Sequence, residues 1–185
     1  CKELEYDDST NAAGHLFCYG NAACQESNVT TADVISCQGR HSCAGSDLTT
    51  TGIRVLCSGK GSCAKADIIS DGDIYLEGYY AGREAALSAG EIYGQGYYAF
   101  TYATIDSLQN YDTKVEAFGH LSGYGATFIC RSGRTCTLKC KGTGCRNMDY
   151  VCLSGATCKV RPARCNRNPR DIVDGDECPN MLTSI

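Results

Sequence analysis

The sequence predicts an all-β solenoid, and the first observation behind this prediction is a cysteine repeat. Cys37-Gln-Gly-Arg-His-Ser-Cys43 is followed 20 residues later by Cys57-Ser-Gly-Lys-Gly-Ser-Cys63, and Cys18-Tyr-Gly-Asn-Ala-Ala-Cys24 is the same unit 19 residues earlier. Cys130-Arg-Ser-Gly-Arg-Thr-Cys136 and Cys152-Leu-Ser-Gly-Ala-Thr-Cys158 share a second frame, with Ser-Gly one place later. A repeat near 20 residues is typical of solenoids, in which each unit buries its apolar face only by stacking on the next.

The second observation is the composition of the segments that lead into the first cysteines. They are short, β-branched and aromatic, as strands are; they are Val34–Cys37, Ile53–Cys57, Thr127–Cys130 and Asp149–Cys152. Because Ile53, Val55 and Cys57 share one parity, an extended strand turns all three to one side and Arg54 to the other. We therefore expect the cysteines to face the core.

The third observation is that no stretch keeps a 3.6-residue apolar period. Glycines and clusters of Asn, Asp and Ser interrupt every candidate segment within about eight residues. The best helical candidate, residues 83–90, would make two turns at most. Helices are therefore expected to be few or absent.

Strand and turn alternating at this period resemble the right-handed parallel β-helix of the pectin-lyase-like superfamily. The resemblance covers roughly residues 16–160 and rests on repeat geometry, without an enzyme motif. It implies a single domain of about seven or eight coils over residues 16–164. Residues 1–15 and 165–185 lack the repeat, and we interpret them as an N-terminal cap or arm and a C-terminal cap or linker tail.

The cysteine content indicates an oxidising compartment, because 15 of the 185 residues are cysteine. One scheme pairs neighbours along the chain, since each bridge then closes a short turn of similar length. The alternative is a vertical ladder, for instance Cys37 to Cys57, because stacked strands lie about 4.8 Å apart. The local scheme leaves Cys1 free to bond another chain. The local pairs are Cys18 with Cys24, Cys37 with Cys43, Cys57 with Cys63, Cys130 with Cys136, Cys140 with Cys145, Cys152 with Cys158, and Cys165 with Cys178.

Three further features bear on localisation. The sequence opens on Cys1 without an initiating Met or a signal-like segment, which suggests a processed chain. It contains no run of 18 apolar residues, so no membrane span is expected. The one glycosylation sequon begins at Asn28, in what we interpret as a turn. These features favour a secreted, extracellular or cell-surface protein.

Tyrosine pairs replace cysteines in the middle of the chain. Tyr79-Tyr80 and Tyr97-Tyr98 stand 18 residues apart, within residues 69–128, which hold no cysteine. One interpretation is internal stacking of rings on successive coils. The other follows from strand alternation: one tyrosine of each pair must lie outside, where the rings would form an exposed aromatic stripe suited to a sugar ring or a neighbouring subunit.

Charge is distributed unevenly along the sequence. Residues 1–130 carry 7 basic and 16 acidic side chains, residues 131–170 carry 10 basic and 1 acidic, and residues 171–185 carry 4 acidic. Since position along a solenoid is position along its axis, we expect an acidic end and a basic end. The basic end could be a solvated surface, a dock for another copy or a patch for acidic polysaccharide; nucleic acid is disfavoured by the inferred compartment. Its residues are Arg131, Arg134, Lys139, Lys141, Arg146, Lys159, Arg161 and Arg164, with Arg167 and Arg170 beyond.

No catalytic or metal-binding constellation emerges from the sequence. The column formed by Asn28, Asp47 and Asp67 fits turn chemistry, because Asn and Asp bond their own backbone in turns. Asp71 and Asp73 could offer oxygens to calcium, but the spaced ligand set of a known loop is missing. The cysteine spacings do not match a zinc site, and the three histidines fall in separate repeats. We expect no cofactor.

The function that we expect from the sequence is that of an extracellular structural protein. Its oppositely charged ends would assemble copies into a filament, sheath or surface layer, end to end or side by side. The Cys-x-Gly-x-x-Ser-Cys units also resemble those of surface proteins from algae and other protists. The alternative is a β-helix that binds or cleaves acidic polysaccharide through its basic coils or its tyrosines. A third hypothesis is ice binding, from the stacked threonines Thr30–Thr31 and Thr49–Thr51.

Overall fold

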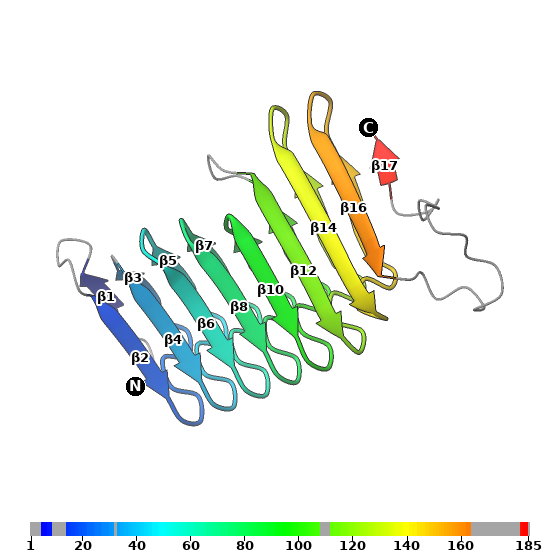
Figure 1. Cartoon of the computed structure of the whole chain (residues 1–185). Helices are drawn as coiled ribbons and strands as arrows, with labels where there is room; N and C mark the ends of the chain where they lie inside the picture. Colours follow the sequence, from blue (N-terminus) through cyan, green and yellow to red (C-terminus); the bar gives the residue numbers. More distant parts are fainter. Residues whose placement is uncertain (1–4, 9–13, 32, 108–111, 164–181, 185) are drawn as a thin grey trace.

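The computed structural model describes residues 5–8, 14–31, 33–107, 112–163 and 182–184. It is an all-β parallel solenoid of about seven turns, and none of the described residues is helical. The strands form two sheets, of nine and of eight strands, in which every pairing is parallel. Figure 1 shows the coils stacked in sequence order from the N-terminus to the C-terminus. The predicted fold class is therefore confirmed.

The eight-stranded sheet holds the first strand of each coil. Its strands are β2 (His15–Tyr19), β4 (Val34–Gln38), β6 (Arg54–Ser58), β8 (Asp73–Glu77), β10 (Glu91–Gln95), β12 (Thr113–Gly119), β14 (Thr135–Gly142) and β16 (Thr157–Ala163). The register aligns Ile35 with Val55 and Val55 with Ile74, and all three side chains are fully buried. Alternation within each strand thus places one apolar column inside the solenoid and leaves the residues between them outside.

The nine-stranded sheet holds the second strand of each coil and one strand at either end. Its strands are β1 (Glu5–Asp8), β3 (Asn28–Thr31), β5 (Asp47–Thr50), β7 (Asp67–Ser70), β9 (Ala86–Ser88), β11 (Thr104–Asp106), β13 (Thr127–Cys130), β15 (Asp149–Cys152) and β17 (Leu182–Ser184). The inner column runs through Leu48 and Ile68 to Phe128 and Tyr150, whose rings stack 4.8 Å apart. The Tyr150 hydroxyl donates a 2.9 Å hydrogen bond to the carbonyl of Cys136, and burial raises the pKa of Tyr150.

A third side is built from the turns that follow the strands of the eight-stranded sheet. Positive φ angles recur at alternate positions there, beginning with a glycine in each coil. A Cβ on Gly39 would lie 2.4 Å from the carbonyl oxygen of Gly20, so stacked turns leave room only for glycine. The Ser62 hydroxyl donates to the carbonyl of Cys37 in the preceding coil, which explains the small residue before each second cysteine.

Disulfides close two different turns. Twelve cysteines form six bridges with sequence separations of 5 or 6, which follow the local scheme and not the ladder. Cys18–Cys24, Cys37–Cys43, Cys57–Cys63 and Cys140–Cys145 tie the eight-stranded sheet to the turn side. Cys130–Cys136 and Cys152–Cys158 instead tie the nine-stranded sheet to the next coil, which accounts for the second sequence frame. Cys1, Cys165 and Cys178 lie outside the described residues.

Two expectations about local structure are wrong, and one is confirmed. Ile53 precedes β6 and is 60% exposed. The strand, and with it the alternation of inward and outward side chains, begins one residue later, at Arg54. Residues 83–90, the best helical candidate, form a turn, the short strand β9 and a connection, in agreement with the expectation that helices are few or absent. Asn28 begins strand β3 and its side chain is exposed, so the sequon lies on a sheet face and not in a turn.

The terminal segments contribute strands to the same body. β1 pairs with β3, and β17 pairs with β15, so each adds one strand to an end of the nine-stranded sheet. The eight-stranded sheet ends at β2 and β16, each of which has one partner among the described strands. Most of the proposed tail, 165–181, lies outside the described residues.

Candidate functional site

The potential catalytic groups in the described part of the chain lie apart. Nε2 of His15 is 2.8 Å from the carboxylate of Asp33, at the first coil. The ring of His41 lies over Gly61, and that of His120 lies beside Tyr97, with ring centroids 5.3 Å apart. One group in the described ranges has metal-ligand spacing, namely Cys18, Cys37 and Cys43, and its sulfurs are in disulfides. Surfaces, and not a catalytic pocket, are therefore the candidate sites.

Four of the predicted basic residues form one compact set on the outer face of the eight-stranded sheet. Lys139 and Lys141 lie two apart on β14, and Lys159 and Arg161 lie two apart on β16, so all four face outward and all are exposed. The register aligns Lys139 with Arg161. We call these four residues the cation array. Lys141, Lys159 and Arg161 have no ion-pair partner among the residues that the structure describes.

A buried carboxylate borders the cation array. Glu116 on β12 is 5% exposed and lies between Lys114 and Lys139, with N···O distances of 2.8 and 3.3 Å. Burial alone would raise the pKa of Glu116, but the hydrogen bonds that Lys114 and Lys139 donate outweigh it and hold the pKa below its ordinary value. Glu116 thus neutralises one edge of the array and leaves the other three cations uncompensated.

The other predicted basic residues that the structure describes do not join this set. Arg131 follows β13 and donates to both carboxylate oxygens of Asp106, at 2.9 and 2.6 Å. This pairing with Asp106 raises the pKa of Arg131. Arg134 precedes β14, and Arg146 lies on the turn side. The expected basic end is therefore spread over several sides; Arg164, Arg167 and Arg170 lie outside the described residues.

The outer face of the nine-stranded sheet carries unpaired carboxylates toward the N-terminus. Asp47 begins β5, Asp67 begins β7, and the register aligns them with each other and with Asn28. All three side chains are exposed, and within the described ranges none makes a hydrogen bond or ion pair. The interpretation as turn residues is therefore wrong, because they begin strands. We call Asp47 and Asp67 the carboxylate pair.

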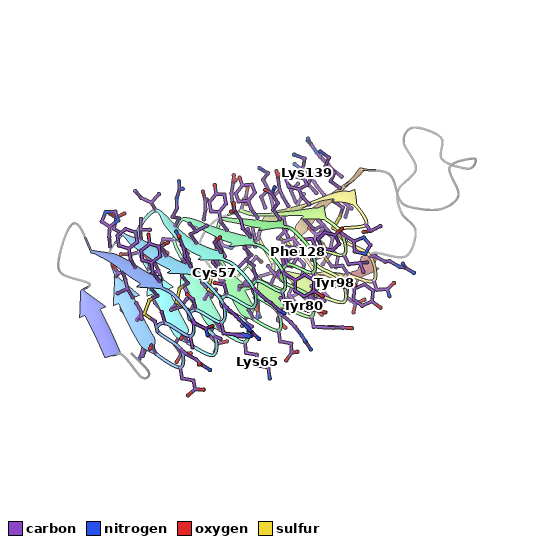
Figure 2. The ribbon with its side chains drawn as sticks, turned by 90° about the horizontal axis from the view of Figure 1, so that it is seen from below. Cys57, Lys65, Tyr80, Tyr98, Phe128 and Lys139 are labelled. Atoms are coloured by element: carbon purple, nitrogen blue, oxygen red, sulfur yellow. A yellow bond between two sulfur atoms is a disulfide. The ribbon has the colours of Figure 1, made fainter. Side chains whose placement is uncertain are left out.

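The four predicted tyrosines lie on the turn side, and all of them reach the surface. Tyr79 and Tyr97 are 41% and 59% exposed, while Tyr80 and Tyr98 are half-buried. The strand-alternation argument fails because the pairs lie in turns, where Tyr80 and Tyr98 have φ angles of 59° and 57°. The rings of Tyr80 and Tyr98 lie 5.1 Å apart, and Tyr79 contacts both. Figure 2 shows Tyr80 and Tyr98 on adjacent coils, with Lys139 on another side of the solenoid.

The grouping of cations was missed by sequence reasoning, although the sequence held its signal. Lys139-x-Lys141 and Lys159-x-Arg161 each separate two cations by one residue within a strand-like segment. Residues two apart in a strand face the same way, and segments one period apart are neighbours. Projection of the charges onto sheet faces, and not onto the axis, would have revealed both the cation array and the carboxylate pair.

Comparison with known proteins adds no family. No family model matches the chain, no curated protein matches it, and no solved structure matches it. Among the described residues, the structure holds no helix with the length and apolar character that a membrane crossing needs. The six disulfides indicate an oxidising environment.

Proposed function

We propose that this chain is an extracellular structural protein whose copies assemble side by side. The observation that carries the proposal is the placement of unpaired charge on opposite sheets. The carboxylate pair lies on the outer face of the nine-stranded sheet near the N-terminal end, and the cation array lies on the outer face of the eight-stranded sheet near the C-terminal end. Each surface is the electrostatic complement of the other.

The two surfaces also share a spacing. Asp47 and Asp67 sit on adjacent strands, as do Lys139 and Arg161. Neighbouring strands are about 4.8 Å apart in every sheet, so charges on the two faces repeat at the same interval. Sheets pack face to face about 10 Å apart, a distance that the long Lys and Arg side chains can bridge. Docking can therefore pair several charges at once.

Contact between two different faces produces an open assembly. A copy that docks its carboxylate pair still presents its own cation array to the next copy, so growth does not close. Because the two patches lie at different levels along the solenoid axis, neighbouring copies in the assembly are staggered. Such an assembly is a filament or layer of parallel solenoids.

End-to-end stacking is less compatible with the strand order. If β2 of one copy paired with β16 of another, β1 of the first copy would fall at the level where β17 of the second already pairs with β15. The two strands would compete for one position. This conflict favours lateral contact over the axial contact that the sequence also allowed.

Secretion and glycosylation belong to the same proposal. Disulfides at this density are typical of secreted proteins. Asn28 is exposed one strand away from Asp47, so a glycan there would project over the carboxylate pair. We expect glycosylated chains to dock more weakly than unmodified ones.

The alternative functions have less support. Arg131, a residue expected to hold acidic polysaccharide, is engaged with Asp106. The threonine array expected of an ice-binding surface is reduced, because Thr31 and Thr50 are buried; Thr30 and Thr49 face outward on their strands, and Thr51 is exposed after the end of β5.

Charge reversal tests the proposal. The variant Lys159→Glu/Arg161→Glu should stay monomeric under low-salt conditions in which the wild type forms larger species in sedimentation velocity. Its matched control is Arg40→Glu/Lys60→Glu, which reverses two exposed cations on the turn side and should assemble as the wild type does. Assembly should also weaken as salt rises, because exposed charges are screened beyond about 10 Å at 0.1 M. A wild type that stays monomeric at high concentration and low salt would contradict the proposal.

A further inference from the structure

The turn side carries an aromatic surface that packing of the core does not require. Beneath it, Ala81, Ala99 and Phe100 already fill the interior and are fully buried. The rings above them are nevertheless exposed: Tyr97 at 59% and Tyr102 at 53%. Exposed aromatic groups that lie together on one face mark binding surfaces more often than isolated ones do.

These rings follow one another along the solenoid axis. Tyr79 and Tyr80 belong to one coil and Tyr97 and Tyr98 to the next, with Tyr79 and Tyr98 centroids 5.9 Å apart. His120 on the following coil extends the row, 5.3 Å from Tyr97. The row therefore spans three successive coils, with rings that meet in tilted and edge-to-face contacts.

The backbone alone does not account for tyrosine in this row. Tyr80 and Tyr98 adopt left-handed φ angles of 59° and 57°, a region that costs most residues about 1–2 kcal/mol. The coil before them has Gly61 at the corresponding position, with a φ of 66°. Glycine would suit the turn better, so the side chains of Tyr80 and Tyr98 serve another purpose.

A groove of about 390 Å³ continues the aromatic row toward the N-terminal coils. Its lining includes Ala44, Gly61 and Ala64, with His41 and Tyr80 beside them. Small residues at these positions leave the hollow open, since a Cβ on Gly61 would lie 2.7 Å from the ring of His41. The volume falls within the range of sites that hold a small organic group.

Cations border both the groove and the row. Lys60 Nζ lies 5.7 Å from the centroid of Tyr79, and the Arg83 guanidinium lies 5.4 Å from that of Tyr80. Glu84 pairs with Arg83 at 2.8 Å and with Lys65 at 3.6 Å, whereas Lys60 has no carboxylate partner in the described part of the chain. Figure 2 shows Lys65 and Tyr80 on the same side of the solenoid. The groove lining also holds Glu26, so its three cations outnumber its two carboxylates and the rim carries a net positive charge.

We infer that this surface binds a chain of acidic polysaccharide lying along the solenoid axis. A pyranose ring presents C–H groups on its face, which pack on an aromatic ring, while its hydroxyl groups project sideways toward polar side chains. An extended polymer can repeat this contact from coil to coil. Lys60 supplies the charge that pairs with carboxylate or sulfate groups. The site lies on the turns, away from both sheet faces, so it is independent of lateral assembly.

The direct test is native electrophoresis in gels that contain one polysaccharide. Polygalacturonate supplies carboxylates, dextran sulfate supplies sulfates, and dextran supplies the uncharged backbone of dextran sulfate. We expect at least one acidic polymer to retard the protein and dextran to bind at least about tenfold more weakly. Tyr97→Ala should weaken binding of the acidic polymer about tenfold, and Tyr97→Phe should retain it, because the ring is what packs on the sugar.

The matched control is Tyr19→Ala. Tyr19 is also 59% exposed, but it lies on β2 of the eight-stranded sheet beside Phe17 and away from the groove. It should bind as the wild type does, and both alanine variants should keep the wild-type unfolding temperature. Equal losses in both variants, unchanged binding in Tyr97→Ala, or no retardation by either acidic polymer would overturn the inference. So would equal binding of dextran, or loss only in Lys159→Ala/Arg161→Ala.

Discussion

Phe100 lies against Gly94 inside the solenoid, at the place where other coils carry a disulfide. A Cβ on Gly94 would be 1.9 Å from Cε1 of Phe100, so the ring occupies the space of the missing side chain. Register places Gly94 beside Leu76, and Leu76 beside Cys57. In the coil of Leu76 the partner position is Gly82, where a Cβ would meet Leu76 Cδ1 at 2.7 Å. Pairs of one large and one small residue thus replace the bridges.

This equivalence predicts that a bridge can be moved into the cysteine-free coils. Gly82 has a φ of 65° and donates its backbone N–H to the carbonyl of Ser62. Cys63 has a φ of 52° and donates its backbone N–H to the carbonyl of Ser42 in the same way. The variant Leu76→Cys/Gly82→Cys should therefore form a disulfide on oxidation. It should exceed Leu76→Ser/Gly82→Ser by about 2 kcal/mol in unfolding free energy, the contribution expected of so short a loop. Two thiols that remain reactive after oxidation would show that the positions are not equivalent.

The stacked glycines predict a contrast between two chemically identical substitutions. Gly39 and Gly20 both have left-handed φ angles, 125° and 107°. A Cβ added to Gly39 would lie 2.4 Å from the carbonyl oxygen of Gly20, whereas a Cβ added to Gly20 would have no neighbour within 4 Å. Gly39→Ala should therefore cost roughly 2 kcal/mol more than Gly20→Ala, because only it adds overlap to backbone strain. Urea unfolding of both variants measures the difference. Equal losses would mean that strain alone fixes glycine in this column.

Glu116 predicts a pH dependence of stability. Its folded pKa lies below the ordinary value of 4.5, so the carboxylate stabilises the fold above the unfolded pKa and this contribution is lost as pH falls through the folded pKa. Glu116→Gln should lower the unfolding free energy by about 1–2 kcal/mol near neutral pH, and this loss should disappear as pH falls through the folded pKa of Glu116. Unfolding curves at several pH values test this. A loss that persists unchanged in acid would assign the effect to packing.

Asn28 predicts a link between glycosylation and assembly. A glycan on Asn28 would stand one strand from Asp47 and block the approach of another copy. Enzymatic removal of the glycan from material made in a secreting host should raise the fraction of assembled protein in sedimentation velocity. Asn28→Gln should assemble to the same extent with or without the enzyme. No change on deglycosylation would separate Asn28 from the docking surface.

Much of the fold could be predicted because the cysteine repeat records the coil length directly. The strands before Cys37 and Cys57 follow from it, whereas the repeat left both local pairs and a ladder open, and the structure has the local pairs. The assignment of the late pairs, such as Cys130–Cys136, to a different turn could not be predicted, since it depends on which sheet each strand joins.

The surfaces were harder to predict, for two physical reasons. Turns with alternating left-handed residues do not obey strand parity, so the exposure of both Tyr79 and Tyr80 has no signal in the alternation. Partners also come from distant positions in the sequence. Asp106 pairs with Arg131, whereas Lys141 has no ion-pair partner among the described residues, and this difference depends on the register between coils of unequal length.

Mixing two charge-reversed variants tests lateral assembly most directly. Asp47→Lys/Asp67→Lys makes both docking faces positive. Lys159→Glu/Arg161→Glu makes two positions of the cation array negative, like the carboxylate pair. We expect each variant alone to sediment as a monomer at low salt and an equimolar mixture to form large species, seen as staggered filaments or layers by electron microscopy. A mixture in which both variants still sediment as monomers would contradict assembly through these faces.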